Sequence, residues 1–539
     1  MPAAVGVDFG TESGRALLLD CASGEELAAH TVPYASGAID RELPGTGERL
    51  PGDWALQDPD DWVSVLETGV PAVLEAAGVP ANEVVGIGLD VTSCTVLPTR
   101  GDGTPLCKLD GWRERRHAWP KLWKHHAAQA VADRLTEVAL ERDEEFLGRY
   151  GGRISSEWYF PKLIEVWLED REVYDACDEF IEATDWIVWW LTGVQRRQNC
   201  TAGYKALWSP LHGLPPNDYF RAAYPGFERP AEKLGESFAA LGTCAGTLRP
   251  EVAARLGLPE SVAVAVGNVD SFVSMPGAGV EQAGTYVMVV GTSICDMVVH
   301  AEEIRLPGIT GVVKDGILPG VYGYEAGQVA AGDMLAWYVE TLGSSYSELE
   351  EAAARLRPGE TGLIALDWWN GNRSILGDAG VTGVIAGLTL QSSREEIYRA
   401  LLEAIALGNR RVIENFAEHG FELSEIVACG GIAERSPLTM QLLADTSGLP
   451  VHVPASSEIP ARGSALFGAV AGGAFDDIGS AIARTRPGTA RTYRPDGGAK
   501  EVYDEVYAIY RELYDTLGRT QVELLHGLKQ IGSEQRRRA

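Results

Sequence analysis

Two short segments of the chain each combine a β-rich run, a tight Gly-Thr turn and a second β-rich run. They are the segments 7–20 and 287–300, with their turns at Gly10-Thr11 and Gly291-Thr292. Glycine lets the backbone approach an anion closely, and the threonine hydroxyl and exposed amides of such a turn can hold a phosphate. Because the segments open successive halves of the chain, they predict a duplicated fold that holds a nucleotide phosphate chain from both sides.

Two aspartates lie at the ends of predicted strands in these halves. Asp8 stands beside the first turn, where a carboxylate can hold Mg²⁺, usually through water. Asp270 follows a predicted buried strand and is placed to act as a general base, which accepts the proton of a substrate hydroxyl as that oxygen attacks a γ-phosphate. The local alternatives are a turn aspartate that caps amides for Asp8 and a helix N-cap for Asp270.

Two further strand ends carry groups suited to ligand binding. The run 84–92 predicts a central strand that ends in Asp90, Thr92, Ser93 and Cys94. Ligand contacts gather at the carboxyl ends of strands in open α/β sheets. Between a later strand and helix, the Ala-Cys-Gly-Gly turn at 428–431 leaves its backbone open to a nucleotide. Taken alone, this Gly-Gly pair is equally compatible with a close strand–helix crossing.

The elements that must position these residues alternate between strands and helices. The pattern predicts a β-hairpin and a third strand in 4–32, a mostly helical region in 113–192 rich in tryptophan, and later helices at 328–342, 346–355, 394–419 and 501–528. Most of the tryptophans are expected in the core, and a minority are expected to wall a sugar pocket. At 539 residues the chain exceeds one hydrophobic core, so we expect two domains with a boundary near 258–265.

Composition argues against several functional classes. The formal charge of −30 disfavours binding to nucleic acid or to an anionic membrane. No apolar run approaches the roughly 18 residues that a membrane helix needs, and the N-terminus has no secretory pattern. The eight cysteines form no C-x-x-C pair and the nine histidines have no metal-ligand spacing, which predicts a reducing cytoplasm and argues against a zinc site. To bind an anionic nucleotide, an acidic protein needs local groups that stabilise negative charge, such as helix N-termini, backbone amides or a divalent cation.

The chain resembles the FGGY family of carbohydrate kinases along essentially its whole length. The resemblance is carried by the two Gly-Thr hairpins, Asp270, the late Gly-Gly turn and the segment 383–403, G-V-I-A-G-L-x(7)-E-I-Y-R-A-L-L-E, which matches the family's C-terminal signature. It implies an α/β fold of two actin-like (ribonuclease H-like) domains with an ATP cleft between them. Residues 1–262 would form the sugar-binding domain and residues 263–539 the ATP-binding domain.

Within the family, the chain looks most like the branch that phosphorylates L-ribulose. The matching segments are 50–62, 90–98, 117–129, 155–162 and 367–374. Members that phosphorylate glycerol carry an Arg-Glu pair where this chain has Thr92-Ser93-Cys94, which argues against glycerol. The usual N-terminal signature has a tryptophan three residues after its lysine, whereas Lys162 here is followed by Trp167, a departure that fits the same branch.

The resemblance implies ATP-dependent phosphorylation of L-ribulose at its 5-hydroxyl to L-ribulose 5-phosphate, a step of L-arabinose breakdown. ATP and Mg²⁺ would be required, and a homodimer is compatible with the family. Asp270 would be the catalytic base and a sugar ligand, and Cys94, Lys205 and Glu325 would contact the sugar. The residues implied for the ATP cleft are Thr11, Glu12, Arg15, Gly291, Thr292, Gly332, Gly431 and Arg435, with Asp8 positioning magnesium.

Other interpretations stay open at this point. Inside the family, the substrate is alternatively another pentulose or pentitol, such as D-ribulose, D-xylulose or ribitol, because one hydrogen bond separates such sugars by only about 0.5–1.5 kcal/mol. Outside it, an actin-like ATPase that is not a kinase shares the hairpins but needs no sugar-facing acid. Away from the family, Lys205 also suits a surface lysine, Glu325 a helix cap and Cys94 a small packed residue.

Overall fold

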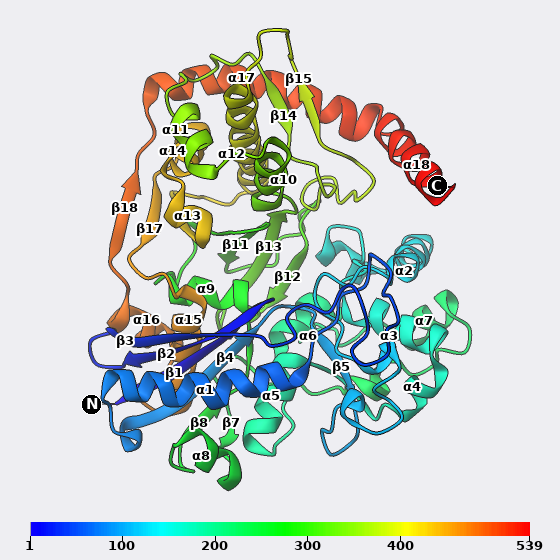
Figure 1. The fold of residues 1–539 in the computed structure, drawn as a ribbon, viewed down its shortest axis with the longest axis vertical. Helices are drawn as coiled ribbons and strands as arrows, with labels where there is room; N and C mark the ends of the chain where they lie inside the picture. Colours follow the sequence, from blue (N-terminus) through cyan, green and yellow to red (C-terminus); the bar gives the residue numbers. More distant parts are fainter. Residues whose placement is uncertain (1, 539) are drawn as a thin grey trace.

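The computed structural model describes residues 2–538, without the side chains of residues 533, 537 and 538. Its two lobes are each built around a seven-stranded sheet (Figure 1). The predicted α/β fold with two similar halves is confirmed, because the strand that opens each sheet has the same neighbours: an antiparallel partner that follows it in the chain and a parallel partner from much later.

The first sheet contains the predicted hairpin and third strand, and its order is β3-β2-β1-β4-β8-β7, with β9 paired to β4. Its strands are β1 (Ala3–Phe9), β2 (Ser13–Asp20), β3 (Glu26–Pro33), β4 (Val84–Val91), β7 (Cys244–Thr247), β8 (Ala263–Ala265) and β9 (Asn268–Val269). β1 is buried along its whole length and β4 along nearly all of it. Near-continuous apolar runs are typical of central strands with parallel neighbours, because both of their faces are covered.

The second sheet has the order β12-β13-β11-β10-β16-β17-β18. Its strands are β10 (Thr285–Val290), β11 (Ile294–His300), β12 (Gly311–Lys314), β13 (Tyr322–Gln328), β16 (Glu425–Cys429), β17 (Val451–Pro454) and β18 (Thr489–Tyr493). Two small two-stranded sheets complete the strands: β5 (Val96–Thr99) with β6 (Glu179–Glu182), and β14 (Ile364–Leu366) with β15 (Val384–Ala386).

Eighteen α-helices connect and cover these sheets in the described part of the chain. The first nine are α1 (Pro59–Ala77), α2 (Gln129–Glu141), α3 (Tyr159–Glu169), α4 (Arg171–Ala176), α5 (Ala183–Thr192), α6 (Asn199–Lys205), α7 (Asn217–Ala223), α8 (Pro250–Leu256) and α9 (Asp270–Gly277). The others are α10 (Gly332–Leu342), α11 (Tyr346–Ala353), α12 (Arg394–Glu418), α13 (Gly431–Arg435), α14 (Pro437–Ser447), α15 (Ile459–Ala471), α16 (Ile478–Thr485), α17 (Gly497–Asp515) and α18 (Glu523–Arg538).

Two expected helical regions are interrupted. The region 113–192 also contains the strand β6 and an irregular stretch before α2. The long helix expected at 501–528 is instead α17 and α18, separated by a π-helical turn at Thr516–Thr520. A Cβ atom at Gly518 in this turn would lie 2.5 Å from a methyl group of Leu376, so glycine lets the turn pack closely against a neighbouring loop.

Helix α15 packs on the first sheet although it comes late in the chain. A Cβ atom at Gly88 on β4 would lie 1.9 Å from the carbonyl oxygen of Ser464, and one at Gly6 on β1 would lie 1.8 Å from that of Ala461. The helix backbone therefore rests directly on β1 and β4. The expected division after residue 262 does not follow this packing, because β8, β9 and α15 all belong with the first sheet.

Apolar packing also joins the two lobes. One buried cluster combines Leu19 and Phe272 with Val287 and Met297 of the second sheet and Leu466 of α15. The lobes are therefore held together by a shared core. None of the helices in residues 2–538 combines the length and apolar character that crossing a bilayer requires.

The close contact of α15 with β4 generates a stability prediction. We expect Gly88→Ala to destabilise the protein by about 1–3 kcal/mol, because the new methyl group overlaps a helix backbone that cannot move freely. The check is the midpoint of thermal unfolding measured by circular dichroism. Gly52→Ala is the control, because a Cβ atom there meets nothing within 4 Å. Equal midpoints for the two variants would contradict the prediction.

Candidate active site

Three aspartates meet at the carboxyl ends of neighbouring strands. Asp8 of β1 pairs in register with Asp90 of β4, and Asp90 pairs with Asn268 of β9. Asp270 comes two residues later as the first residue of α9, and its backbone carbonyl accepts a hydrogen bond from the Ser274 hydroxyl at 3.0 Å. The strand-end positions that the sequence singled out therefore lie side by side.

The charges of these aspartates act on one another. Burial, followed by the charge of Asp8, raises the pKa of Asp270 to about 7. Burial and Asp8 also raise the pKa of Asp90 well above its usual value, although the Ser464 hydroxyl donates a hydrogen bond to one of its oxygens. The other oxygen, Asp90 Oδ1, is buried without a hydrogen-bond partner. This cluster has a high density of negative charge that a cation would stabilise.

The surroundings of Asp8 decide how a cation would fit. Arg15 Nη1 lies 3.0 Å from Asp8 Oδ2, so the predicted ATP-cleft arginine neutralises part of the cluster. Among residues 2–538, no three His, Cys, Asp or Glu side chains are grouped so that they could hold a metal ion by themselves. Mg²⁺ usually keeps several waters and takes one or two carboxylates plus substrate phosphates. Asp8, with the orphaned Asp90 Oδ1 beside it, fits that mode.

The first Gly-Thr turn is held by side chains that the sequence analysis did not single out. Trp123 Nε1 donates a hydrogen bond to Thr11 Oγ1 at 3.0 Å, and Gln57 Nε2 donates one to the Thr11 carbonyl at 3.0 Å. Glu12, predicted for the ATP cleft, is exposed beside them. Trp123 and Gln57 lie in two of the segments that match the L-ribulose branch. This match is the only feature of the sequence that could have pointed to them.

The second Gly-Thr turn is bonded to the start of α10. Gly332 N donates to the Gly291 carbonyl at 3.1 Å, and Ala331 N donates to the Thr292 carbonyl at 3.1 Å. A Cβ atom at Gly332 would lie 2.7 Å from the Gly291 oxygen. The glycine pattern therefore permits a contact between turn and helix that any side chain would prevent, and it brings three predicted ATP-cleft residues together.

The late Gly-Gly turn joins the same group. Gly430 has φ +93°, and a Cβ atom there would lie 2.8 Å from the carbonyl oxygen of Val290, next to Gly291. Gly431 begins α13, and Arg435 Nε donates back to the Gly431 carbonyl at 3.0 Å. All five ATP-cleft residues predicted from the second half therefore lie on three adjoining backbone segments.

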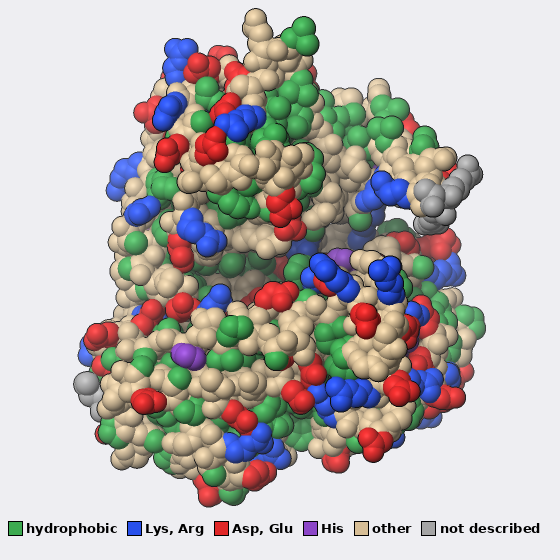
Figure 2. Space-filling model, in the orientation of Figure 1, with side chains coloured by type: hydrophobic (Ala, Val, Ile, Leu, Met, Phe, Trp, Pro, Cys, Tyr) green, Lys and Arg blue, Asp and Glu red, His purple; other side chains and the backbone are tan. Residues whose placement is uncertain are grey.

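A groove lies between the two lobes (Figure 2), and charged groups from both lobes act on one another there. Burial raises the pKa of Asp333 in α10, and the charge of Lys124, the neighbour of Trp123, opposes that rise. Burial also raises the pKa of Glu458, on which the charges of Arg15 from β2 and Glu434 from α13 both act. Figure 2 shows the groove as a hollow between the two lobes.

On another side of Asp270, Lys205 and Glu325 form a buried ion pair. Lys205 Nζ lies 2.9 and 2.7 Å from the two carboxylate oxygens of Glu325. Burial would lower the pKa of Lys205, but the charge of Glu325, the charge of Cys94 and the hydrogen bond to Glu325 together raise it. Lys205 ends α6 in the first lobe and Glu325 lies on β13 in the second, where β12 reaches α6 (Figure 1). Both predicted sugar ligands are therefore ordered by each other.

Cys94 has a positive φ angle, and a buried lysine donates a hydrogen bond to its carbonyl oxygen. Its φ of 61° lies in the left-handed region, which costs free energy for a residue other than glycine. Lys162 Nζ donates to the Cys94 carbonyl at 2.6 Å and to the Leu122 carbonyl at 2.8 Å, and burial lowers the pKa of Lys162 to about 8. Burial raises the pKa of the Cys94 thiol to about 12, so this cysteine is not an activated nucleophile.

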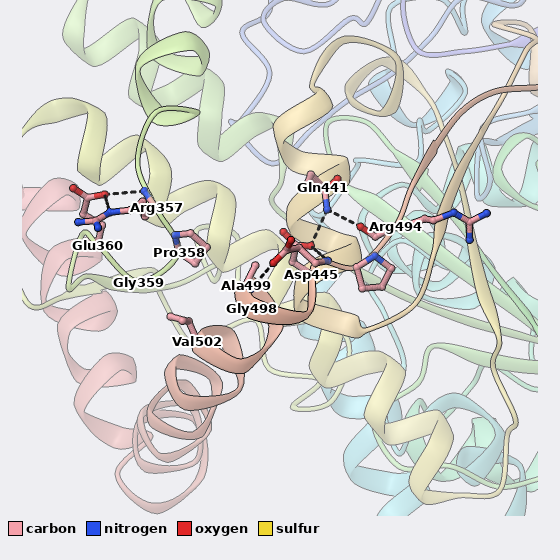
Figure 3. Close-up of a pocket in the computed structure, with 12 residues that line it drawn as sticks. Arg357, Pro358, Gly359, Glu360, Gln441, Asp445, Arg494, Gly498, Ala499 and Val502 are labelled. Carbon is pink, nitrogen blue, oxygen red and sulfur yellow. Dashed lines mark hydrogen bonds and ion pairs between the residues drawn. The ribbon is translucent and has the colours of Figure 1, made fainter.

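A separate surface hollow of about 840 Å³ lies on the second lobe (Figure 3). Gln441 bridges Asp445 and the Arg494 carbonyl there, and Arg357 pairs with Glu360. None of the predicted site residues lines it. These polar groups satisfy one another, and the hollow is separate from the groove between the lobes.

Comparison with known families agrees with this geometry. The N-terminal domain model of the FGGY family of carbohydrate kinases matches residues 3–277, and the C-terminal domain model matches residues 286–472. The chain belongs to the FGGY family of carbohydrate kinases. The predicted resemblance is confirmed, and the protein is a carbohydrate kinase of this family.

Several FGGY relatives share nearly the whole chain. The ribulokinase of Anoxybacillus flavithermus is 47% identical over 97% of this chain and 96% of its own length. The ribulokinase of Halalkalibacterium halodurans is 46% identical over 99% of this chain and 98% of its own length. A solved xylulose kinase from Brucella ovis has a TM-score of 0.80 at 22% identity and covers 96% of this chain and 99% of its own. This last likeness shows the fold alone.

The raised pKa of Asp270 predicts a pH-dependent stability change. In the unfolded chain this carboxyl ionises near its ordinary pKa, about 3.9, whereas in the folded protein it ionises near 7. Folding stability therefore falls as pH rises between these values, and the loss is complete above 7. We expect Asp270→Asn to raise the thermal unfolding midpoint at pH 8, with a smaller gain at pH 5.5.

The measurement is the midpoint at both pH values, compared with Asp218→Asn. Asp218 is an exposed aspartate in the first turn of α7, and its pKa is lowered by Arg142. That control is expected to show no gain at pH 8. If the unfolding midpoint of Asp270→Asn falls at pH 8, or rises equally at both pH values, the raised pKa of Asp270 in the folded protein is wrong.

Proposed function

We propose that the protein transfers the γ-phosphoryl group of ATP to the 5-hydroxyl of L-ribulose. The observation that carries the proposal is the position of Asp270 two residues after Asn268, which pairs with Asp90, where the charges of Asp8, Lys205 and Glu325 all act on its carboxyl group. The relatives named ribulokinase support L-ribulose as the sugar. The product, L-ribulose 5-phosphate, is an intermediate of L-arabinose breakdown, the pathway that the family resemblance implies.

Asp270 would act as the general base. A carboxyl group with a pKa of about 7 is a better proton acceptor than an ordinary aspartate, and it still ionises near neutral pH. The 5-hydroxyl proton would pass to Asp270 as the oxygen attacks the terminal phosphorus, and ADP would leave. In a loose transition state this proton moves late, so the carboxylate mainly orients the hydroxyl in line with the phosphate.

Lys205, Glu325 and Cys94 would orient the sugar. The lysine ammonium donates to sugar oxygens and the glutamate carboxylate accepts from hydroxyl groups, so their pairing fixes one donor and one acceptor in place. The Cys94 turn would contribute its backbone or small side chain at the end of β4. We infer that the lobes close over the sugar and exclude water, which is a competing nucleophile.

The two Gly-Thr turns, Gly332, Gly431 and Arg435 would hold the nucleotide. The 291–293 turn would donate backbone hydrogen bonds to the phosphates. The first amides of α10 donate to carbonyls of this turn, and the N-terminus of the helix would favour the negative charge of the nucleotide. Asp8, through water and with Asp90 nearby, would hold Mg²⁺. When bound, this ion neutralises phosphate charge during transfer.

We also infer a cytoplasmic location, which the eight free cysteines support because such thiols persist in a reducing compartment. A homodimer stays a prediction from the family. Sedimentation of the purified protein across a concentration series would measure the oligomeric state directly.

The base assignment predicts the kinetics of one variant. We expect Asp270→Asn to lower kcat for sugar phosphorylation by about 10²–10⁴-fold, because the base is lost while the site keeps its shape. ATP affinity, measured by calorimetry with an unreactive ATP analogue, should stay within about twofold. Asp218→Asn is the matched control and should keep the parent rate. Parental phosphorylation of L-ribulose by Asp270→Asn would show that the mechanism is wrong.

The substrate assignment is tested by an ATP-coupled assay across the four 2-pentuloses, ribitol and glycerol. We expect the highest kcat/KM with L-ribulose, because the chain carries Thr92-Ser93-Cys94 rather than the Arg-Glu pair of the glycerol-phosphorylating members. If kcat/KM is higher with D-ribulose, D-xylulose or ribitol, the protein is still a sugar kinase, but L-ribulose is the wrong substrate. ATP hydrolysis that no sugar stimulates would instead favour an actin-like ATPase.

A further inference from the structure

A second ion pair joins the two lobes beside Lys205 and Glu325. Glu157, in the loop before α3, lies 3.5 Å from Arg373, in the loop between β14 and β15. Their side chains are 16% and 21% exposed, so both are partly accessible to solvent. Glu157 belongs to the segment 155–162 and Arg373 to the segment 367–374, two of the matching segments to which the sequence analysis gave no role.

The two ion pairs form one electrostatic cluster. Burial would raise the pKa of Glu157, but the charges of Arg373, His126 and Lys205 lower it. Burial would lower the pKa of Arg373, but Glu157 and then Glu325 raise it. Each lobe thus contributes one acid and one base, and the charges of the two pairs reach each other. Cys94, the third predicted sugar ligand, lies within the same field.

Each member of the second pair is linked through a neighbouring residue to a segment that contains a predicted sugar ligand. On the second lobe, the neighbour of Arg373, Ser374, accepts a hydrogen bond from Gly327 N at 2.8 Å, and Gly327 lies two residues after Glu325 on β13. On the first lobe, Glu157 precedes α3, whose Lys162 holds the Cys94 carbonyl. The pair is therefore set in place with the rest of the sugar side.

The geometry of the pair leaves hydrogen-bonding capacity unused. At 3.5 Å the contact is longer than a charged hydrogen bond of about 2.7–2.9 Å. By contrast, Lys205 and Glu325 approach to 2.7 Å. A guanidinium group only donates and a carboxylate only accepts, whereas a sugar hydroxyl does both. A hydroxyl can therefore bridge Arg373 and Glu157 with a single orientation.

We propose that Glu157 and Arg373 are a second pair of sugar ligands, which hydrogen-bonds oxygens of an open-chain pentulose or pentitol and helps to select its stereochemistry. The inference rests on the proposed function, because it names further groups of the same site. It adds a donor and an acceptor to the set formed by Lys205, Glu325, Cys94 and Asp270. Because the partners come from different lobes, a sugar between them also links the lobes in the closed form.

The test is steady-state kinetics of Arg373→Met and Glu157→Gln. We expect KM for the sugar to rise about tenfold or more in each, because a charged hydrogen bond is worth about 1.5–3 kcal/mol, while KM for ATP stays within about twofold. Arg373→Lys keeps the positive charge but loses the planar pair of guanidinium donors, and it should raise KM for the sugar less than Arg373→Met does. Glu26→Gln is the control, because Glu26 forms an ion pair with Arg462 at 3.0 Å between chain segments outside this cluster.

A second readout uses binding without ATP. L-Ribulose should raise the unfolding midpoint of the parent and of Glu26→Gln, and this gain should be lost in Arg373→Met and Glu157→Gln. The proposal is overturned if folded variants keep the sugar KM within twofold of the parent. It is also overturned if the KM values for sugar and ATP rise together with a lower midpoint, because that result indicates a purely structural link between the lobes.

The outcomes separate this inference from the proposed function. If the parent prefers another sugar of the assay panel, the substrate assignment fails and the same variants are measured on that sugar. If the parent phosphorylates no sugar, the proposed function fails, and the sugar-induced midpoint shift still decides whether Glu157 and Arg373 bind one. If the parent phosphorylates L-ribulose and the variants match it, only the role of the pair is wrong.

Discussion

The direct contact between the backbone of α15 and the central strands of the first sheet is the constraint on which the rest of the site depends. Glycines at positions 6, 86 and 88 remove every side chain that would separate helix and sheet. The contact brings the Ser464 hydroxyl of α15 within hydrogen-bonding distance of Asp90, at the end of β4. Together with the apolar cluster shared by both lobes, it sets where the second sheet stands relative to the first.

The two ends of the groove have opposite electrostatic character. Around Asp8, Asp90 and Asp270, burial and neighbouring like charges raise the pKa values of Asp90 and Asp270, so a cation would stabilise the ionised site. Around Lys205 and Glu325, charges alternate and compensate each other. The first arrangement suits proton transfer and a metal–nucleotide, and the second suits a neutral polyol that offers many hydroxyl groups.

Much of the fold and part of the site could be predicted from local pattern. The hairpins, the strand 84–91 and its polar end, and the Gly-Gly turn before α13 appear where the sequence placed them. Other residues had no local signal. Lys205 and Glu325 were visible only through the family resemblance, and Trp123 and Arg373 only as members of matching segments. Their roles arise from partners far away in the chain, which no window of neighbouring residues contains.

The sequence by itself determined which stretches form strands, where glycine permits a tight turn, and which acids follow a strand, because these depend on periodicity and on the backbone freedom of single residues. Only the tertiary structure decided that β8, β9 and α15 belong with the first sheet, and that Lys205 meets Glu325 and Glu157 meets Arg373. The reason is physical: such pairings depend on how two sheets pack through a shared core and a glycine contact, and hydrophobic burial alone does not specify which distant elements meet.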